Sequence, residues 1–313
     1  MRKFLKTENT RRINERLSPS SGWYYEAGET LHEGKTPFQE IELVTTEEFG
    51  RTLLLDGATQ VMEKNEFQYH ESLAHLPLLS HRNPRRVLII GGGDGGLVRE
   101  VLKHPCVQSV DFIELDEEVV LFSRRYLLEL NKGAFEDPRV KLSFMDGRAF
   151  VEAAAPATYD VILMDMTDPA GPSLRLYTQE FFLAVRRILR DDESLFAMHS
   201  ESPETRPEAF ARIRSTLASV FPLVRLAYTY IRMYGTLWSF ALCSASTDPK
   251  KIDGETIERR LAERGISALK LVSPDTWPAF FVHWPYIGAL LTEPGPISTD
   301  AEPDFPDSFD PRG

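Results

Sequence analysis

The chain has 313 residues, of which 42% are hydrophobic and 27% are charged. These values are typical of a soluble globular protein with room for one large or two ordinary domains. The formal net charge of −11 argues against binding to nucleic acid or to an anionic membrane surface, because both need a basic face on the protein. Two cysteines are too few for a disulfide framework, and no segment has the pattern of a signal peptide or a membrane span, so we expect a cytoplasmic protein.

Residues 1–82 are predicted to form a small antiparallel β domain with a connecting helix. Short segments between residues 20 and 64 alternate apolar and polar side chains, and glycines lie between or beside them. Residues 66–80 have the apolar spacing of a helix, which Pro77 is expected to interrupt near its end. The Asn-Pro-Arg-Arg sequence at 83–86 is the expected junction with the next domain.

The stretch 87–116 combines a strand, a glycine-rich turn, a helix and a second strand. Gly91, Gly93 and Gly96 have the G-x-G-x-x-G spacing, which allows a ligand to approach the backbone and a helix to pack tightly on a strand. Glu114 lies roughly 20 residues further along, where a carboxylate can accept hydrogen bonds from both ribose hydroxyls of a nucleoside. The pattern therefore predicts a site for an adenosine-containing ligand.

Asp94 lies inside the glycine turn and narrows the choice of ligand. In a dinucleotide site this turn faces a pyrophosphate, which a carboxylate would repel. S-adenosylmethionine and its relatives instead carry a sulfonium, an ammonium and no phosphate. We therefore predict a cationic nucleoside as the ligand, which also suits the acidic net charge.

Residues 83–291 alternate strand and helix patterns, with strands expected at 140–146, 159–166 and 194–200 and closing strands at 224–231 and 238–245. This alternation predicts an α/β fold in which helices cover both faces of a parallel sheet. Ligands bind such sheets at the carboxyl ends of the strands, where the acidic residues of this chain collect: Asp94, Glu114, Asp146, Asp165 and Asp168. Residues 292–313 form an acidic, proline-rich tail, expected either to be disordered or to fold over a cationic site.

Asp165 and Asp168 lie three residues apart on a loop that contains two prolines and a glycine. An alkylammonium has a pKa near ~10, so one carboxylate can accept its proton as the nitrogen attacks a sulfonium carbon, while the other holds a second ammonium. Turn formation or helix capping is the alternative role for these residues.

No metal site is predicted, because the spacing of His70 and His75 is i, i+5 rather than the i, i+4 of a zinc-binding helix.

Over about residues 23–291 the chain resembles the polyamine aminopropyltransferases, the family of spermidine synthase, in motifs that include GKTPFQEIEL, FGRTLLLDG, EFQYHE, VLIIGGGDGG and DMTDPAGP. Members of this family transfer an aminopropyl group from decarboxylated S-adenosylmethionine to an amine and release methylthioadenosine. The resemblance implies a Rossmann-like sheet of the class I methyltransferase type, a small N-terminal antiparallel β domain, no prosthetic group, and assembly as a homodimer or homotetramer.

The resemblance also implies roles for individual residues. Asp165 matches the proton-accepting residue. The positions expected to bind substrate are Tyr69, His70, Asp168, Pro172, His199, Glu201 and Tyr234, of which His70 and Pro172 would line the nucleoside pocket. The positions expected to bind the nucleoside donor are Gln39, Gly91, Gly93, Asp94, Gly96, Glu114, Asp146 and Gly147.

Three segments near the expected amine site depart from the family pattern: 63–66 reads EKNE for ERDE, 199–204 reads HSESPE for QxESPW, and 233–236 reads MYGT for TYPSG. Putrescine is the leading acceptor, giving spermidine. Glu204 in place of Trp suggests a pocket for a longer or more highly charged amine, and residues 297–300 resemble the tail of thermospermine synthases. Two other functions remain open: a small-molecule methyltransferase that uses S-adenosylmethionine, and a polyamine-binding protein without catalysis.

Overall fold

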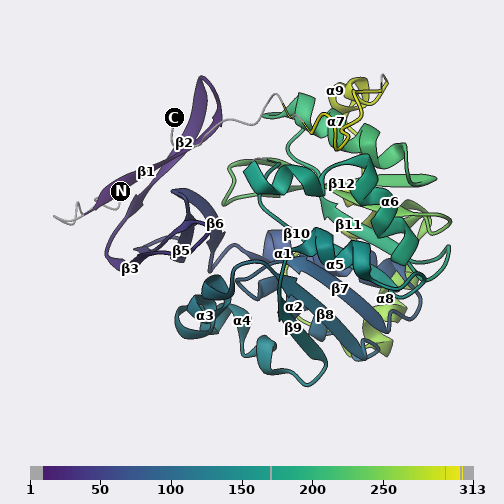
Figure 1. Cartoon of the computed structure of the whole chain (residues 1–313), viewed down its shortest axis with the longest axis horizontal. Helices are drawn as coiled ribbons and strands as arrows, with labels where there is room; N and C mark the ends of the chain where they lie inside the picture. The colour runs from purple at the N-terminus through teal and green to yellow at the C-terminus, as the bar shows by residue number, and fades with distance from the viewer. Residues whose placement is uncertain (1–9, 170, 293, 304, 306–313) are drawn as a thin grey trace.

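The computed structural model describes residues 10–169, 171–292, 294–303 and 305, and only the backbone of Pro172 (Figure 1). Among these residues the strands form a two-stranded, a four-stranded and a seven-stranded sheet. The first two sheets belong to the N-terminal part of the chain, and the third, with its helices, forms the larger part of the molecule (Figure 1).

The N-terminal part is antiparallel throughout, as predicted, but it is divided into two sheets. A hairpin projects from the molecule (Figure 1) and is followed by the four-stranded sheet; the strands are β1 (Arg11–Ser18), β2 (Ser21–Ala27), β3 (Thr30–Lys35), β4 (Glu40–Thr46), β5 (Gly50–Leu55) and β6 (Ala58–Met62). Apolar side chains of the four-stranded sheet, such as Leu43 and Leu53, pack against Phe122 and Leu130 of the larger part. This contact packs the small sheet against α3 (Glu117–Tyr126) and α4 (Leu128–Asn131).

Helix α1 (Phe67–Ser80) follows and is buried over nearly its whole length. It continues through Pro77 to Ser80, so the predicted interruption is wrong. Pro77 lies in the last turn, where the His81 N–H still donates to its carbonyl oxygen at 3.0 Å, and the packing of α1 against α2 and β10–β13 outweighs the one backbone hydrogen bond that proline removes.

The large sheet has the order β12-β13-β11-β10-β7-β8-β9. Five of its strands are parallel and β12 and β13 form an antiparallel hairpin at one edge; the bounds are β7 (Arg86–Gly91), β8 (Ser109–Glu114), β9 (Val140–Phe144), β10 (Val161–Asp165), β11 (Leu195–His199), β12 (Leu223–Ile231) and β13 (Thr236–Ser244). The predicted strands and the Rossmann-like α/β class are confirmed.

Helices cover both faces of this sheet (Figure 1). Along β7, Val87 and Ile89 belong to the core that contains α1 and α2, whereas Leu88 and Ile90 belong to the core that contains α5, α6 and α7. This alternation is what a strand buried on both faces requires. The helices are α2 (Gly96–Leu102), α3 (Glu117–Tyr126), α4 (Leu128–Asn131), α5 (Gly147–Ala153), α6 (Gln179–Ile188), α7 (Pro207–Ala218), α8 (Gly254–Glu263) and α9 (Pro285–Leu290), with short 3-10 turns η1 (Ala134–Glu136), η2 (Gly171–Leu176), η3 (Pro249–Lys251) and η4 (Trp277–Phe281).

The direction of the winding reverses at β7. The chain runs outward from β7 to β8 and β9, and then returns to β10 on the other side of β7 before it reaches β11. The carboxyl ends of β7 and β10 are therefore neighbours, with Gly91 in register with Asp165. A reversal of this kind opens a crevice outside the strand ends, where ligands of α/β sheets bind.

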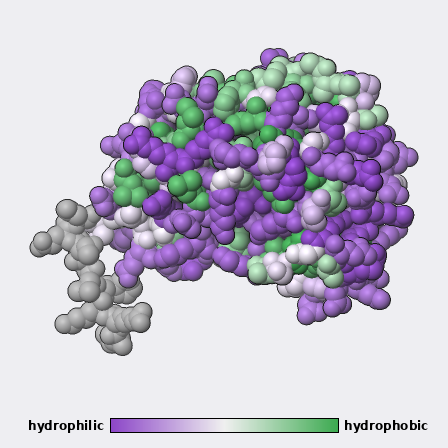
Figure 2. Space-filling model, turned by 90° about the horizontal axis from the view of Figure 1, so that it is seen from below, coloured by the Kyte–Doolittle hydropathy of each residue, from purple (hydrophilic) through white to green (hydrophobic). Residues whose placement is uncertain are grey.

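Within the described residues, no helix has the length and apolar character needed to cross a membrane. The face shown in Figure 2 is mostly hydrophilic, with hydrophobic residues in separate groups. In the described part of the tail, the Asp300 carboxylate accepts hydrogen bonds from Arg148 Nη1 at 2.7 Å and from Thr178 Oγ1 at 2.8 Å. This part of the tail therefore lies against α5 and the start of α6.

Candidate functional site

The glycine turn after β7 is packed too closely for larger residues. Gly91 has a φ of +81°, and a Cβ at this position would lie closer than 3.0 Å to the Asp165 carbonyl oxygen of β10. A Cβ on Gly96 would collide with the ring of His70, and one on Gly93 would meet the end of β8 and α3. Each glycine therefore allows a different element to pack against the turn.

Asp94 lies in this turn at the end of a row of alternating charges. Its Oδ1 accepts a hydrogen bond from the Gly96 N–H at 2.6 Å, and its Oδ2 lies 3.6 Å from His70 Nε2. His70 Nδ1 is 2.6 Å from Glu66 Oε2, which also accepts from Arg99 at 2.9 Å. Burial alone would lower the pKa of His70, but Asp94 and Glu66 raise it to about 10, so the ring is an imidazolium at neutral pH. His70 thus acts on the site through Asp94.

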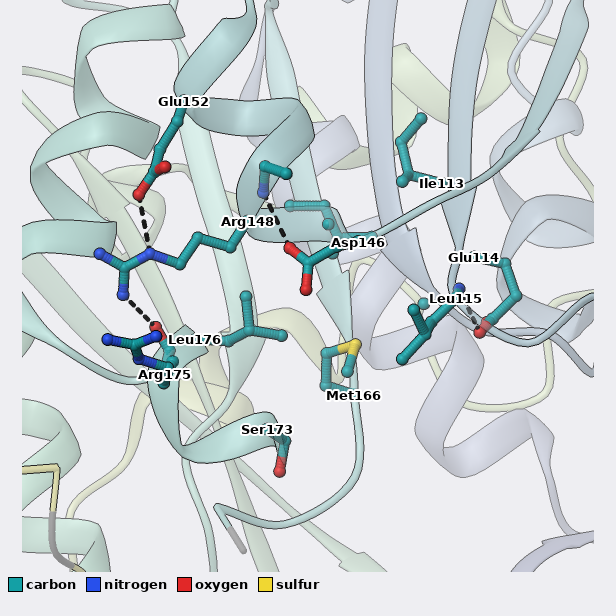
Figure 3. A pocket seen from close by; sticks show the side chains of 14 residues that line it. Ile113, Glu114, Leu115, Asp146, Arg148, Glu152, Met166, Ser173, Arg175 and Leu176 are labelled. Carbon is teal, nitrogen blue, oxygen red and sulfur yellow. Dashed lines mark hydrogen bonds and ion pairs between the residues drawn. The ribbon is translucent and has the colours of Figure 1, made fainter. Parts of the chain in front are cut away.

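Between the ends of β7, β8 and β10 and the turn η2 lies a cavity of about 290 Å³ (Figure 3). Gly91, Glu114, Asp146 and Gly147, four of the predicted donor-binding residues, line it together with Met166 and side chains of η2 and α5. In Figure 3, Glu114 and Asp146 enter this cavity from neighbouring elements. These predicted residues come from the ends of β7, β8 and β9, and the fold brings them together at one cavity.

The two acids in the cavity are held by backbone N–H groups. Glu114 Oε1 accepts from the N–H groups of Leu115 and Asp116 at 2.7 and 3.0 Å. Burial raises the pKa of Glu114 to about 7, although these two hydrogen bonds oppose the rise. Asp146 caps α5 by accepting from the Ala149 N–H at 2.8 Å. Its capping role does not prevent ligand contact, because Asp146 also lines the cavity.

Gln39 reaches this region from the N-terminal sheet. Its Nε2 donates to Asp116 Oδ2 at 3.0 Å, and Thr36 Oγ1 donates to the same oxygen at 2.6 Å. Asp116 follows Leu115, which lines the cavity. Gln39 itself does not line this cavity. Through its hydrogen bond to Asp116, it instead holds the segment that follows β8.

Asp165 ends β10 and lies between the glycine turn and the expected amine side of the site. Its Oδ2 atom is buried and has no hydrogen-bond partner among the described residues. Burial raises the pKa of Asp165 to about 6, and the Asp94 carboxylate contributes to the rise, whereas His70 and the Tyr69 hydroxyl oppose it. At neutral pH the residue is therefore mostly a carboxylate with a free acceptor oxygen, which is what a proton acceptor needs.

On the other side of Asp165, aromatic rings from distant segments lie together. The rings of Tyr69 and Tyr234 meet edge to face with centroids 5.9 Å apart, and Tyr234 lies 4.8 Å from Trp238. His199 at the end of β11 stacks on Trp238 at 5.7 Å, and its Nε2 lies 2.8 Å from the Tyr177 hydroxyl. Burial lowers the pKa of His199 below its usual value, which favours the neutral ring at physiological pH.

Beyond this aromatic wall, Asp168 and Glu201 approach one cation. Asp168 Oδ2 lies 2.7 Å from Arg206 Nη1, and Glu201 Oε2 lies 3.7 Å from the same nitrogen. One ligand atom each of Asp168, His199 and Glu201 also falls within 4.8 Å of the others. Arg206 is a site residue that the sequence analysis missed.

Glu204, which replaces the family's Trp, is exposed, and its Oε1 accepts a hydrogen bond from Tyr286 at 2.7 Å. The charge in this segment that reaches Asp168 is Arg206, two residues later. The side chain of Pro172 lies outside the described residues.

Comparison with known families gives two matches along the chain. Residues 66–253 match the spermine/spermidine synthase domain, and residues 12–63 match the spermidine synthase tetramerisation domain. A polyamine aminopropyltransferase of Nitrosomonas europaea is 40% identical over 298 residues, which cover 95% of this chain and 91% of the relative. A polyamine aminopropyltransferase of Moorella thermoacetica is 44% identical over 242 residues, which cover 77% of this chain and 84% of the relative.

Solved structures give the same result. A spermidine synthase in complex with the transition-state analogue AdoDATO superposes with a TM-score of 0.84 at 31% identity, covering 93% of this chain and 99% of that one. The spermidine synthase of Thermotoga maritima superposes with a TM-score of 0.82 at 32% identity, covering 90% and 94% of the two chains. The chain therefore belongs to the spermine/spermidine synthase family.

Proposed function

We propose that this protein transfers the aminopropyl group of decarboxylated S-adenosylmethionine to putrescine, forming spermidine and methylthioadenosine. The observation that carries the proposal is the buried carboxylate oxygen of Asp165, which has no hydrogen-bond partner among the described residues and lies between the glycine turn and the aromatic wall. It is supported by the membership in the family and by the acids that line the cavity.

In the proposed reaction the neutral nitrogen of the amine attacks the methylene carbon next to the sulfonium. The new C–N bond forms as the C–S bond breaks, and the electron pair of that bond makes the sulfur a neutral thioether. The nitrogen becomes more acidic as its positive charge develops, and Asp165 accepts its proton. Because the pKa of Asp165 is about 6, most molecules carry the required carboxylate at pH 7.

The donor would be held by the acids of the glycine turn and the cavity. Asp94 is placed to pair with the terminal ammonium of the decarboxylated donor, and it would repel the carboxylate of S-adenosylmethionine itself. Glu114 is placed to accept hydrogen bonds from the ribose hydroxyls. The Asp94 carboxylate therefore suits a cationic ligand, and it would repel the phosphate of a nucleotide.

Mass spectrometry of the products tests the proposal. Purified protein is given decarboxylated S-adenosylmethionine with putrescine, cadaverine, agmatine, 1,3-diaminopropane or spermidine. We expect methylthioadenosine together with an aminopropylated product, and the largest yield with putrescine. Absence of methylthioadenosine with every amine would contradict the proposal. A methylated product formed from S-adenosylmethionine would replace it with methyl transfer.

We also infer that the chain assembles through its N-terminal β domain. The family domain that matches residues 12–63 is described as a tetramerisation domain, and the β1–β2 hairpin projects from the molecule (Figure 1). On this hairpin Tyr24 is 54% exposed, with the Arg12 guanidinium 3.8 Å above its ring. Light scattering of the full chain should give a dimer or tetramer, and a monomer at micromolar concentration would contradict the inference.

A further inference from the structure

The amine side of the site already contains a cation from the protein. Arg206 lies immediately before α7, and its backbone N–H donates to the Ser202 carbonyl oxygen at 3.0 Å. Its guanidinium reaches Asp168 at 2.7 Å and Glu201 at 3.7 Å, while only 12% of its side chain is exposed. The guanidinium therefore lies where these two acids would otherwise hold an ammonium of a substrate.

Glu201 is placed there by a strained backbone. Its φ is +65°, a left-handed conformation that costs a residue with a Cβ about 1 kcal/mol or more. The Ser239 N–H and Oγ donate to its carbonyl oxygen at 3.1 and 2.6 Å, which stabilises this conformation, and its side chain is fully buried. A carboxylate held in this way next to Arg206 is a built feature of the site rather than a surface contact.

The charges on this side can be counted. Asp168 and Glu201 contribute two formal negative charges and Arg206 one positive charge, while burial lowers the pKa of His199 and favours its neutral ring. Asp168, Glu201 and Arg206 therefore sum to about one negative unit by this formal count. A diamine that reacts through one neutral nitrogen has one remaining ammonium, whereas a triamine has two.

We propose that Arg206 is a specificity-determining residue that matches the amine side to a single ammonium and selects diamines over more highly charged polyamines. The proposal rests on the proposed aminopropyl transfer and names its acceptor class. A second ammonium of a longer amine would meet the guanidinium instead of a free acid, and like charges at close range in a partly buried site repel strongly. In the sequence, Glu204 suggested an acceptor amine with more positive charge. In the structure, however, the Glu204 carboxylate accepts a hydrogen bond from Tyr286.

The test compares kcat/KM for putrescine and spermidine at low salt in the wild type, Arg206→Gln and Arg206→Lys. Wild type should favour putrescine at least tenfold. Arg206→Gln should raise the spermidine-to-putrescine ratio about tenfold or more, because it removes the guanidinium that pairs with Asp168 and Glu201. Arg206→Lys keeps the charge and should keep the ratio within about threefold. Arg259→Gln removes an exposed arginine of α8 that pairs with Glu263, and serves as the matched control.

The outcomes separate the two proposals. If wild type forms no methylthioadenosine with any amine, the proposed function fails. If wild type is active but Arg206→Gln changes both amines equally, Arg206 has only a structural role and the inference is wrong. If Arg206→Gln does not fold, the wild-type ratio decides, because equal kcat/KM values for the diamine and the triamine would overturn the inference alone.

Discussion

The two halves of the site are built in different ways. The proposed donor half takes its predicted acids and glycines from residues 91–147, at the ends of β7, β8 and β9, and Met166 and η2 complete the cavity. The acceptor half collects Tyr69 from α1, Asp168 after β10, Glu201 after β11 and Tyr234 between β12 and β13. The donor half is organised largely by backbone, through glycines and N–H groups, whereas the acceptor half depends on side chains that only folding brings together.

The largest effect is expected at the boundary of the two halves. Asp165→Asn should lower kcat by about a thousandfold, because general-base catalysis contributes on the order of 10²–10⁴-fold. The KM values of both substrates should change little. For wild type, kcat/KM for the amine should fall as the pH drops below about 6, the pKa of Asp165, and steady-state kinetics across pH 5–9 would measure both effects. Unchanged turnover in the variant would contradict the assigned role.

The same substitution should make the folded protein more stable. The folded-state pKa of Asp165, about 6, is raised above the value near 4 of an unfolded chain, so its contribution to stability is fully present below pH 4 and lost as the pH rises through 6. At pH 8 the variant should therefore exceed wild type by up to about 3 kcal/mol in the free energy of unfolding. The gap should narrow as the pH falls toward 4 in urea titrations.

A substitution in the backbone of the donor half should have the next largest effect. Gly91→Ala would place a Cβ closer than 3.0 Å to the Asp165 carbonyl oxygen at a φ of +81°. We expect donor affinity, measured by calorimetry, to fall at least about a hundredfold, because strand β10 must shift. Gly265→Ala is the matched control: its φ is +62°, but no heavy atom lies within 4 Å. Equal losses in the two variants would mean that backbone strain, not close packing, matters.

Glu66, His70 and Arg99 form a charged network next to Asp94. Glu66→Gln leaves the His70 imidazolium and the Arg99 guanidinium facing each other without their shared carboxylate. Breaking such a buried network should cost about 3 kcal/mol in the free energy of unfolding. Because the pKa of His70 is raised to about 10, the contribution of His70 to this network's stabilisation is full below pH 6.5 and lost as the pH rises through 10. The deficit of the variant should shrink accordingly above pH 10.

The kinetics of Glu66→Gln test whether the donor half and the acceptor half act separately. The KM of the donor should rise while that of the amine stays within about twofold, because Glu66 holds the His70 ring that faces Asp94 in the glycine turn. Glu263→Gln, which breaks the exposed pair with Arg259, is the control and should leave both stability and kinetics nearly unchanged. An equal rise in both KM values would show that the two halves are not separable.

The donor half could be predicted from the sequence because its physical requirements are local. Gly91, Gly93 and Gly96 must keep their spacing to pack against β10, β8 and α1, and Glu114 must follow at the end of the next strand. The parallel pairing of the strands could also be predicted, since alternating strands and helices require it. The continuation of α1 through Pro77 could not, because it depends on tertiary packing that overrides local propensity.

In the acceptor half, the ion pair of Arg206 with Asp168 escaped prediction for a related reason. Nothing in the spacing of Asp168, Glu201 and Arg206 shows that three side chains spread over 38 residues meet at one point. Sequence comparison by motif drew attention to Glu204 because it replaces an expected Trp, whereas the structure turns it outward. One sequence signal could have pointed to the Arg206–Asp168 pair. It is an arginine just before a helix, next to a segment that departs from the family pattern.

The smallest expected effect gives the finest distinction between the halves. Glu114→Gln should raise the KM of the donor about tenfold, because an amide accepts the ribose hydroxyls less strongly than a carboxylate. In wild type, kcat/KM for the donor should fall as the pH drops below about 7, where Glu114 takes up its proton, and the variant should lose this step but keep the one near 6 that belongs to Asp165. The KM of the amine should not respond. If it rises together with that of the donor, Glu114 orders the whole site, and the separation of a donor half from an acceptor half is wrong.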